Sequence, residues 1–295
     1  MTIAVTGAAG NLGGHITSAL DRTGHDYRVI ARREPTRPVE HEHVVVEGGY
    51  DDADGLTEAL RGVDRLFLMS TPDLPEVRIP RHRNAITAAQ RAGVGHVVFL
   101  SLHDAVPDSP FPFAAANADA EAVLRASGPD WTVLAPNIYA EAIAAQTART
   151  VAATGVFDLP FGSGRAGYVT RADIAAVVAA VMTTPGHAGA TYEITGPASH
   201  SGKEVAQLLT DLLGRPVGYA PLTEQDYVDG LTAYGLPEVT ARAFAGLSAA
   251  IAQGRFDLVT STVPDLTGRA ATPLAEHLAT EAALFGQEGS AAAMP

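Results

Sequence analysis

A glycine-rich turn lies between a strand pattern and a helix pattern at the start of the chain. The apolar run Ile3–Thr6 predicts a buried strand, and Asn11–Asp21 predicts an amphipathic helix. Between them, Gly7, Gly10 and Gly13 follow a Gly-x-x-Gly-x-x-Gly spacing. Such a turn is meaningful only when a strand leads into it and a helix leads out of it. The chain is therefore predicted to begin with the first βα unit of a parallel sheet.

Strand and helix patterns go on alternating through the first half of the chain. Strands are expected at residues 27–31, 43–46, 65–69, 96–100 and 131–134, and helices at 53–60, 79–92 and 114–126. Short connections between such elements imply parallel pairing with right-handed crossovers. The sequence thus predicts an α/β fold with a doubly wound, Rossmann-type parallel sheet.

The regular alternation of strand and helix patterns ends after about residue 150. Helices are expected at residues 171–182, 201–213, 236–253 and 273–284, with strands only at 191–195 and 217–220. We expect a dinucleotide-binding domain over residues 1–150. A smaller, mostly helical substrate-binding lobe should follow over 151–285, interleaved with the sheet. Residues 286–295 are expected to form a disordered tail.

The first turn has the chemistry of a phosphate site. Gly7 permits the tight turn, Gly10 lets backbone N–H groups approach a pyrophosphate, and Gly13 lets the helix pack closely on the strand. Ala9, Asn11 and Leu12 complete the loop at the positive end of the helix. A nicotinamide dinucleotide is the expected ligand.

Two arginines indicate which dinucleotide is preferred. About 20 residues after the glycines, NAD-binding chains usually offer an acidic side chain to the ribose hydroxyls. Here Arg32 and Arg33 follow the second strand instead. Because guanidinium groups bind a 2′-phosphate in bidentate fashion, NADP(H) is expected rather than NAD(H). The alternative is a solvated arginine pair without a ligand.

The amino-acid composition limits which ligands and partners the protein is expected to bind. The 295 residues carry a net charge of −13, which disfavours nucleic acid because its phosphates repel a negative protein. There is no cysteine, which excludes disulfides and thiolate sites. The N-terminus has no signal pattern and no apolar run could span a bilayer, so a cytoplasmic protein without membrane association is expected. His41, His43 and His82 are interpreted as surface residues, and no metal site is expected.

The chain resembles the NmrA-like, atypical branch of the short-chain dehydrogenase/reductase superfamily, near its NAD(P)H:quinone oxidoreductase and isoflavone-reductase-like members. The resemblance covers nearly the whole chain. It is carried by residues 6–13, Gly62-Val63-Asp64, residues 92–98 leading into Ser101, Glu121 with Ala126-Ser127-Gly128, residues 131–136, Asp173-Ile174-Ala175, Thr195-Gly196-Pro197 and residues 203–206. The family contains enzymes as well as catalytically silent redox sensors.

The resemblance also implies roles for residues at strand ends. Met69, Ser70 and Thr71 would lie near the nicotinamide ribose, Ser101 beside the nicotinamide, and Pro136, Asn137 and Tyr139 would close over the nicotinamide end. Ordinary loop packing is the alternative for each of them.

The side chains that usually donate the proton in this superfamily are missing from the chain. The Tyr-x-x-x-Lys pair of the superfamily is absent, because the only lysine, Lys203, has Ser199 four residues before it. Related atypical members often carry Lys or His four residues before the helix glutamate, where this chain has Asn117 before Glu121. An amide cannot act as a general acid. His103 and Tyr139 remain as candidate donors, and an exposed loop position is the alternative for His103.

A site without a strong acid suits some substrates better than others. Hydride addition to a quinone forms a phenolate-like anion, and the reference pKa of a phenol is about 10, so little acid assistance is needed. We therefore expect an NADPH-dependent reductase of quinones or polycyclic aromatic ketones, with a small aromatic substrate. A non-catalytic NADP(H) sensor acting through a protein partner and a ketoreductase of secondary metabolism stay open, as does a homodimer.

Overall fold

The computed structural model describes residues 1–34 and 41–286. Backbone proximity divides the chain into two compact units. Unit 1 comprises Met1–Pro107, Phe113–Pro136 and Ile174–Glu193, and unit 2 comprises Asp108–Pro112, Asn137–Asp173 and the described residues from Ile194 on. Apart from Gly286, the expected disordered tail at 286–295 lies outside the described residues.

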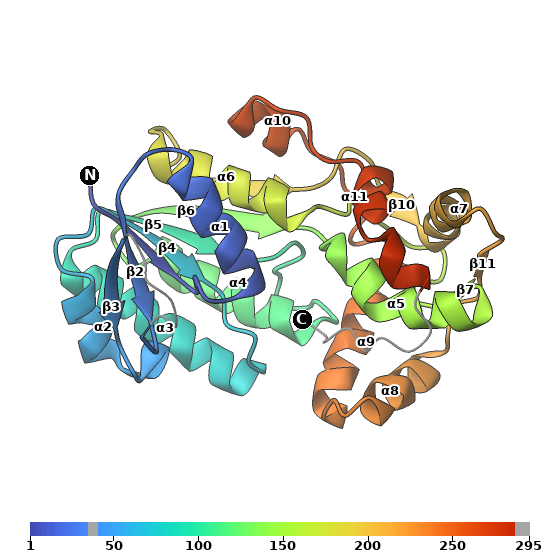
Figure 1. Cartoon of the computed structure of the whole chain (residues 1–295). Coiled ribbons are helices and arrows are strands. Elements are labelled where there is room, and N and C mark those ends of the chain that lie inside the picture. The colour runs from blue at the N-terminus through green and yellow to red at the C-terminus, as the bar shows by residue number, and fades with distance from the viewer. Residues whose placement is uncertain (35–40, 287–295) are drawn as a thin grey trace. The chain divides into compact units, whose positions relative to one another are not determined.

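Unit 1 is built on a seven-stranded sheet in the order β3-β2-β1-β4-β5-β6-β9 (Figure 1). The strands are β1 (Ile3–Thr6), β2 (Tyr27–Ala31), β3 (Glu42–Val45), β4 (Arg65–Met69), β5 (His96–Leu100), β6 (Asp130–Pro136) and β9 (Ala190–Ile194). Each neighbouring pair from β3 to β6 is parallel. This sheet confirms the predicted doubly wound α/β fold. Its order reverses between β1 and β4, and open α/β sheets bind ligands in the crevice outside the carboxyl ends of the strands at such a point.

Helices cover both faces of this sheet. They are α1 (Asn11–Asp21), η1 (Gly49–Asp51), α2 (Ala53–Ala59), α3 (Pro75–Ala92), α4 (Pro112–Arg125) and α6 (Arg171–Thr183). One apolar core joins α2, α3 and α4 to sheet residues such as Leu66, Val97 and Phe99. Figure 1 shows α1 and α6 on the opposite face. Because β5 is buried at every position, its uninterrupted apolar run is the pattern of a strand covered on both sides.

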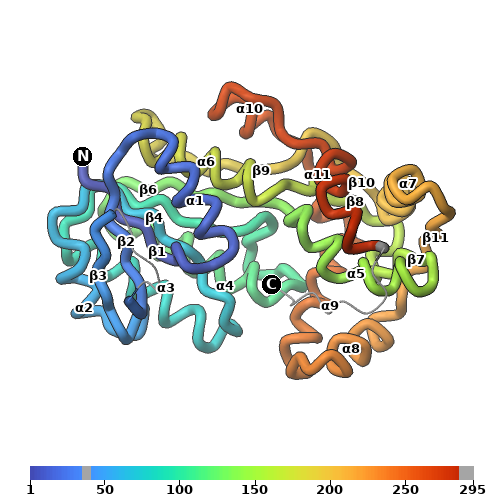
Figure 2. Tube along the Cα trace, in the orientation of Figure 1, coloured from blue at the N-terminus to red at the C-terminus, as the bar shows by residue number. Residues whose placement is uncertain are grey.

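Unit 2 is mostly helical, and its path is followed most easily in Figure 2. It contains α5 (Glu141–Thr154), α7 (Gly202–Leu213), α8 (Glu224–Ala233), α9 (Glu238–Ala252), α10 (Thr262–Thr267), α11 (Leu274–Thr280) and η2 (Ala282–Gly286). Its short strands β7 (Val156–Phe157), β8 (Arg165–Ala166), β10 (His200–Ser201) and β11 (Gly218–Tyr219) form the pairs β10-β8 and β11-β7. The aromatic side chains of Phe157, Tyr168 and Phe256 lie in its core.

A buried carboxylate explains one segment of the family resemblance. Asp173 is fully buried, accepts from the Thr170 hydroxyl at 2.9 Å and from the Thr272 backbone N–H at 2.9 Å, and pairs with Arg269 at 2.6 Å. The Thr170 hydroxyl in turn accepts the N–H of Asp173. Asp173 therefore fixes the start of α6 and ties it to the chain near residue 270.

Several helices differ from the sequence expectations. Helix α3 begins at Pro75 and not at residue 79, because Pro75 takes the favoured first position and Pro80 is accommodated inside the helix. Helices α5 and α8 were not expected, since alanine, glutamine and threonine dilute their apolar periodicity.

Among the residues that the structure describes, no helix is both long and apolar enough to cross a lipid bilayer.

Helix α1 sits directly on the turn that follows β1. Gly7 adopts a φ of +72°, which lets the chain reverse beside the side chain of Met69. A Cβ on Gly13 would lie 2.1 Å from the carbonyl oxygen of Gly7, whereas a Cβ on Gly14 would meet nothing within 4 Å. The helix can approach the turn this closely only with glycine at position 13.

This contact predicts opposite effects for two neighbouring glycines. Gly13→Ala should lower the free energy of unfolding by about 1–3 kcal/mol, because backbone atoms must shift to admit the methyl group. Gly14→Ala, the matched control, should raise it by up to about 1 kcal/mol through helix propensity. Urea denaturation measures both, and equal effects would contradict the packing argument.

Candidate functional site

The N-terminus of α1 is open to an anion. Ala9, Gly10 and Asn11 are exposed, while Leu12 is buried and anchors the helix. Gly10 caps the helix without any side-chain hydrogen bond, and the first turn holds no acidic residue. A Cβ at Gly10 would stay 3.5 Å from its nearest neighbour, so packing within the protein does not require glycine there. Close approach of a ligand does account for it.

Hydrogen bonds hold the crevice between β1 and β4 in shape. The Thr6 hydroxyl donates to the Phe67 carbonyl at 3.2 Å and accepts the Met69 N–H at 2.9 Å. The hydroxyl of Tyr50 bonds to Thr6 at 2.6 Å and donates to the Met69 carbonyl at 2.9 Å. Burial raises the pKa of Tyr50 well above its ordinary value, so the phenol stays protonated. Met69 is thereby fixed beside the Gly7 turn.

Arg32 and Arg33 are exposed at the carboxyl end of β2, next to the crevice. The aliphatic part of Arg32 lies against Gly49, where a Cβ would come within 2.9 Å of it. Arg81 bonds to Asp51 and lowers the pKa of that carboxyl, and the nearby charge of Arg32 lowers it further. Arg81 thus pairs with Asp51, a carboxylate close enough to Arg32 to feel its charge, and the exposed Arg32 guanidinium is suited to an exogenous anion.

Ser70 and Asn117 meet above the end of β4. Ser70 donates from its hydroxyl to Asn117 Oδ1 at 3.2 Å, and the buried guanidinium of Arg78 donates to the same oxygen at 3.3 Å. Arg78 also lies over the ring of Phe113, 4.4 Å from its centroid. The Nδ2 atom of Asn117 is buried without a hydrogen-bond partner in the described part of the chain. Asn117 therefore offers N–H groups but no transferable proton. Arg78 was not among the predicted site residues.

His82 is buried, and the expectation that it lies at the surface is wrong. Its Nε2 accepts the backbone N–H of Thr71 at 3.1 Å, and its ring packs edge-on against Phe99. Burial, and then the nearby charge of Arg78, lower the pKa of His82 to about 3, so the ring is neutral. The helical period running back from the buried Ala85, Ile86 and Ala89 places Arg78 and His82 on this face, which is the signal that could have found them.

Ser101, at the end of β5, is bound to a carboxylate. Its hydroxyl donates to Glu121 Oε1 at 2.5 Å, and Arg125 donates to Glu121 Oε2 at 2.8 Å. Glu121 thus orients Ser101, and the Asn117 oxygen receives its bonds from Ser70 and Arg78. With its own proton committed, the Ser101 oxygen can only accept a hydrogen bond from a ligand.

His103 lies two residues further on and pairs with an acidic residue. Its Nδ1 lies 2.7 Å from Glu193 Oε2 on β9, and its backbone N–H donates to the Pro136 carbonyl at 2.9 Å. Its side chain is only 13% exposed, so the interpretation of His103 as an exposed loop residue is wrong. Glu193 was not foreseen, since a lone glutamate on a short strand has no distinctive pattern.

The two remaining predicted residues belong to unit 2. Asn137 is buried, donates from Nδ2 to the Phe256 carbonyl at 3.1 Å and accepts the Ile138 N–H at 2.8 Å, which gives it a role in packing. Tyr139 is half-buried, with the Arg171 guanidinium 5.6 Å from the centroid of its ring. Within residues 1–34 and 41–286, no three His, Asp or Glu side chains are grouped so that they could hold a metal ion.

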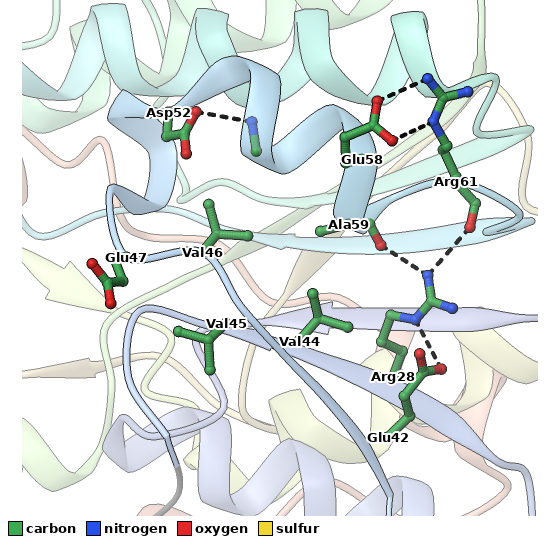
Figure 3. Close-up of a pocket in the computed structure, with 11 residues that line it drawn as sticks. Arg28, Glu42, Val44, Val45, Val46, Glu47, Asp52, Glu58, Ala59 and Arg61 are labelled. Carbon is green, nitrogen blue, oxygen red and sulfur yellow. Dashed lines mark hydrogen bonds and ion pairs between the residues drawn. The ribbon is translucent and has the colours of Figure 1, made fainter.

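A pocket of about 600 Å³ lies away from these residues, beside β3 and α2 (Figure 3). Several of its polar side chains bind one another or the backbone. Arg28 pairs with Glu42 at 2.9 Å and donates to the Ala59 carbonyl at 2.8 Å, and Arg61 pairs with Glu58 at 2.7 Å. These side chains already have partners, whereas the N-terminus of α1 at the carboxyl ends of the strands has no side-chain cap. We therefore place the candidate site at the crevice.

Comparisons with known proteins show the family of the chain. Residues 7–185 match the NAD(P)H-binding family. The chain is 32% identical over 286 residues to the NAD(P)H azoreductase of Xenophilus azovorans, covering 96% of this chain and 99% of the relative. It is 34% identical over 280 residues to quinone oxidoreductase 2 of Escherichia coli strain K12, covering 94% of this chain and 97% of the relative. A crystal structure of the NADPH-dependent quinone oxidoreductase from Escherichia coli, complexed with NADPH, is similar with a TM-score of 0.86 at 32% identity, covering 95% of this chain and 99% of that one.

The buried His82 predicts a pH dependence of stability. Its pKa is lower in the folded protein than its ordinary value of 6.5, so its stabilising contribution is complete above pH 6.5 and is lost as the pH falls toward 3. His82→Gln keeps an acceptor for Thr71 and removes the titration. It should flatten the fall of unfolding free energy between pH 6 and pH 4 by up to about 1.4 kcal/mol per pH unit.

The measurement is urea denaturation at several pH values. The exposed His15, changed to Gln, is the matched control and should leave the wild-type slope unchanged. A His82→Gln slope equal to that of the wild type would show that His82 is not buried in its neutral form.

Proposed function

We propose that this chain, which belongs to the NAD(P)H-binding family of NmrA-like reductases, is an NADPH-dependent reductase of quinones and related flat aromatic acceptors. The observation that carries the proposal is the buried Asn117, which stands beside Ser70 and Arg78 where a proton-donating side chain would otherwise be expected. The relatives named as an azoreductase and a quinone oxidoreductase support the substrate class.

The residues of the crevice fit the dinucleotide. The uncapped N-terminus of α1, with Gly7, Ala9, Gly10, Asn11, Leu12 and Gly13, would hold the pyrophosphate. Arg32, with Arg33 beside it, would bind the 2′-phosphate at the end of β2. The nicotinamide half would then lie toward β4 and β5, near Met69, Ser70, Thr71 and Ser101, with Pro136 at the end of β6. The bound cofactor supplies a hydride.

The electrostatics favour an acceptor that becomes a stable anion. The guanidinium of Arg78 is buried and positive, and it polarises the Asn117 amide that it contacts. A hydrogen bond from Asn117 Nδ2 to a quinone oxygen would strengthen as negative charge develops there. A simple ketone would instead form an alkoxide of much higher basicity, for which a hydrogen bond from an amide is insufficient.

Unit 2 is proposed to supply the substrate lobe, as the sequence suggested for residues 151–285. Its helices α8 and α9 contribute buried aromatic and aliphatic side chains to its core. Tyr139, predicted as a proton donor, belongs to unit 2. Asn137 supports the lobe through its backbone partners.

The proposed activity predicts a direct assay. Purified protein should consume NADPH in a saturable manner with naphthoquinones and anthraquinones, and NADH should be a much poorer donor. Absorbance of the reduced nicotinamide follows the reaction. Binding of NADPH detected by fluorescence, without consumption across the panel, would overturn the reductase and favour the non-catalytic sensor.

The cofactor preference predicts a charge-specific effect at Arg32. Arg32→Ala should weaken NADPH binding by roughly 10- to 100-fold, because it removes charge-assisted hydrogen bonds to the 2′-phosphate. NADH binding should change little. Arg22→Ala, which removes an equally exposed arginine after α1, is the control and should leave both affinities intact. Equal losses for NADPH and NADH would refute the assignment of Arg32.

A further inference from the structure

The pair of His103 and Glu193 is built by two separate strands. His103 follows the end of β5, and Glu193 lies on β9, ninety residues later in the chain. The His103 Nδ1 and Glu193 Oε2 atoms are 2.7 Å apart, with side-chain exposures of 13% and 35%. A contact this short between partly buried groups is a charge-assisted hydrogen bond.

The backbone around His103 is fixed as well. Its N–H donates to the Pro136 carbonyl at 2.9 Å, which ties the loop to the end of β6. The next residue, Asp104, has a φ of +61°, the only left-handed conformation of a non-glycine residue in the described chain. Its carbonyl accepts the N–H of Val106 at 2.8 Å and closes a tight turn. Local geometry and Glu193 thus determine together where the ring lies.

Glu193 also determines which ring nitrogen exchanges protons. A carboxylate only accepts hydrogen bonds, so the bond at Nδ1 requires that Nδ1 carries a hydrogen. In the neutral ring the lone pair is then at Nε2, and in the charged ring the proton that leaves is the one on Nε2.

We propose that Glu193 is a positioning residue that holds His103 with its Nε2 as the proton-donating atom for reduction. The inference rests on the proposed reductase function. It extends that function to acceptors whose reduced anion is strongly basic, with an azo group as the representative class. For quinones, Asn117 and Arg78 suffice, and His103 is dispensable.

The proposed reduction of the azo group conserves atoms and electrons. Hydride from the bound cofactor adds two electrons and one hydrogen to one nitrogen of the azo group, and the N=N double bond becomes a single bond. The second nitrogen then takes a proton from His103 Nε2, which gives the hydrazine. His103 is left neutral, with Nδ1–H still donating to Glu193, and it recovers its proton from water. The oxidised dinucleotide is the other product.

The position of the proton on the ring can be measured without any substrate. ¹⁵N NMR of the histidine rings, at a pH where His103 is neutral, should show the Nδ1–H tautomer in the wild type. Glu193→Ala should convert His103 to mostly Nε2–H, the form preferred by free imidazole. Glu193→Gln keeps an acceptor oxygen and should retain much of the wild-type signal. An unchanged tautomer in Glu193→Ala would overturn the positioning role.

The kinetic test compares two acceptors in the same variants. Glu193→Ala should lower kcat for an azo dye by about 10- to 100-fold, in line with the loss of a general acid, while kcat for a naphthoquinone changes less than about threefold. KM for NADPH should stay unchanged, and Glu193→Gln should recover part of the azo activity. Glu42→Ala on β3 makes the same exchange at another ion-paired glutamate and should affect neither acceptor.

The outcomes separate the two proposals. Equal losses with azo dye and quinone would indicate a structural role for Glu193 and overturn the inference, while the reductase function would stand. A wild-type protein that reduces neither acceptor would overturn the reductase function and the proton-donating role of His103. The NMR result would still decide whether Glu193 holds the ring.

Discussion

The contact between α1 and the turn after β1 determines where everything else in unit 1 can act. Because Gly13 lies against the Gly7 carbonyl, the first turn of α1 is held directly at the carboxyl edge of the sheet. Its N–H groups receive no side-chain cap and meet no acidic residue. The positive end of the helix therefore lies at the point where the strand order reverses, and a pyrophosphate bound there would set the position of both halves of the dinucleotide.

From that fixed point, each strand-end residue is held by a partner from another element. Thr71 is held by His82, Ser70 by Asn117, Ser101 by Glu121 and His103 by Glu193. Loops alone would leave these groups mobile, whereas partners on helices and strands fix their rotamers. The site is thus a set of loop residues whose precision comes from the helices α3 and α4 and from β9.

Sequence reasoning succeeded where the information is local. The spacing of Gly7, Gly10 and Gly13 and the run from residue 96 to 100 are short patterns with one structural solution, and they predicted the doubly wound sheet and its cofactor. Reasoning failed where the determinant is a distant contact. Glu193 meets His103 across ninety residues, and Arg78 acts through Asn117 from another helix. His82 was misplaced because a histidine is usually at least partly exposed, and only the buried face of α3 overrides that tendency.

The same long-range contact gives a physical reason for the missing acid. A lysine in place of Asn117 would bring an ammonium group close to the buried guanidinium of Arg78, which now donates to Asn117 Oδ1 at 3.3 Å. Two like charges in a buried site are strongly unfavourable, and one would lose its proton or be expelled. A neutral amide avoids the repulsion and accepts the guanidinium bond. Arg78 and Asn117 are therefore a matched pair, in which the neutral amide accommodates the buried guanidinium.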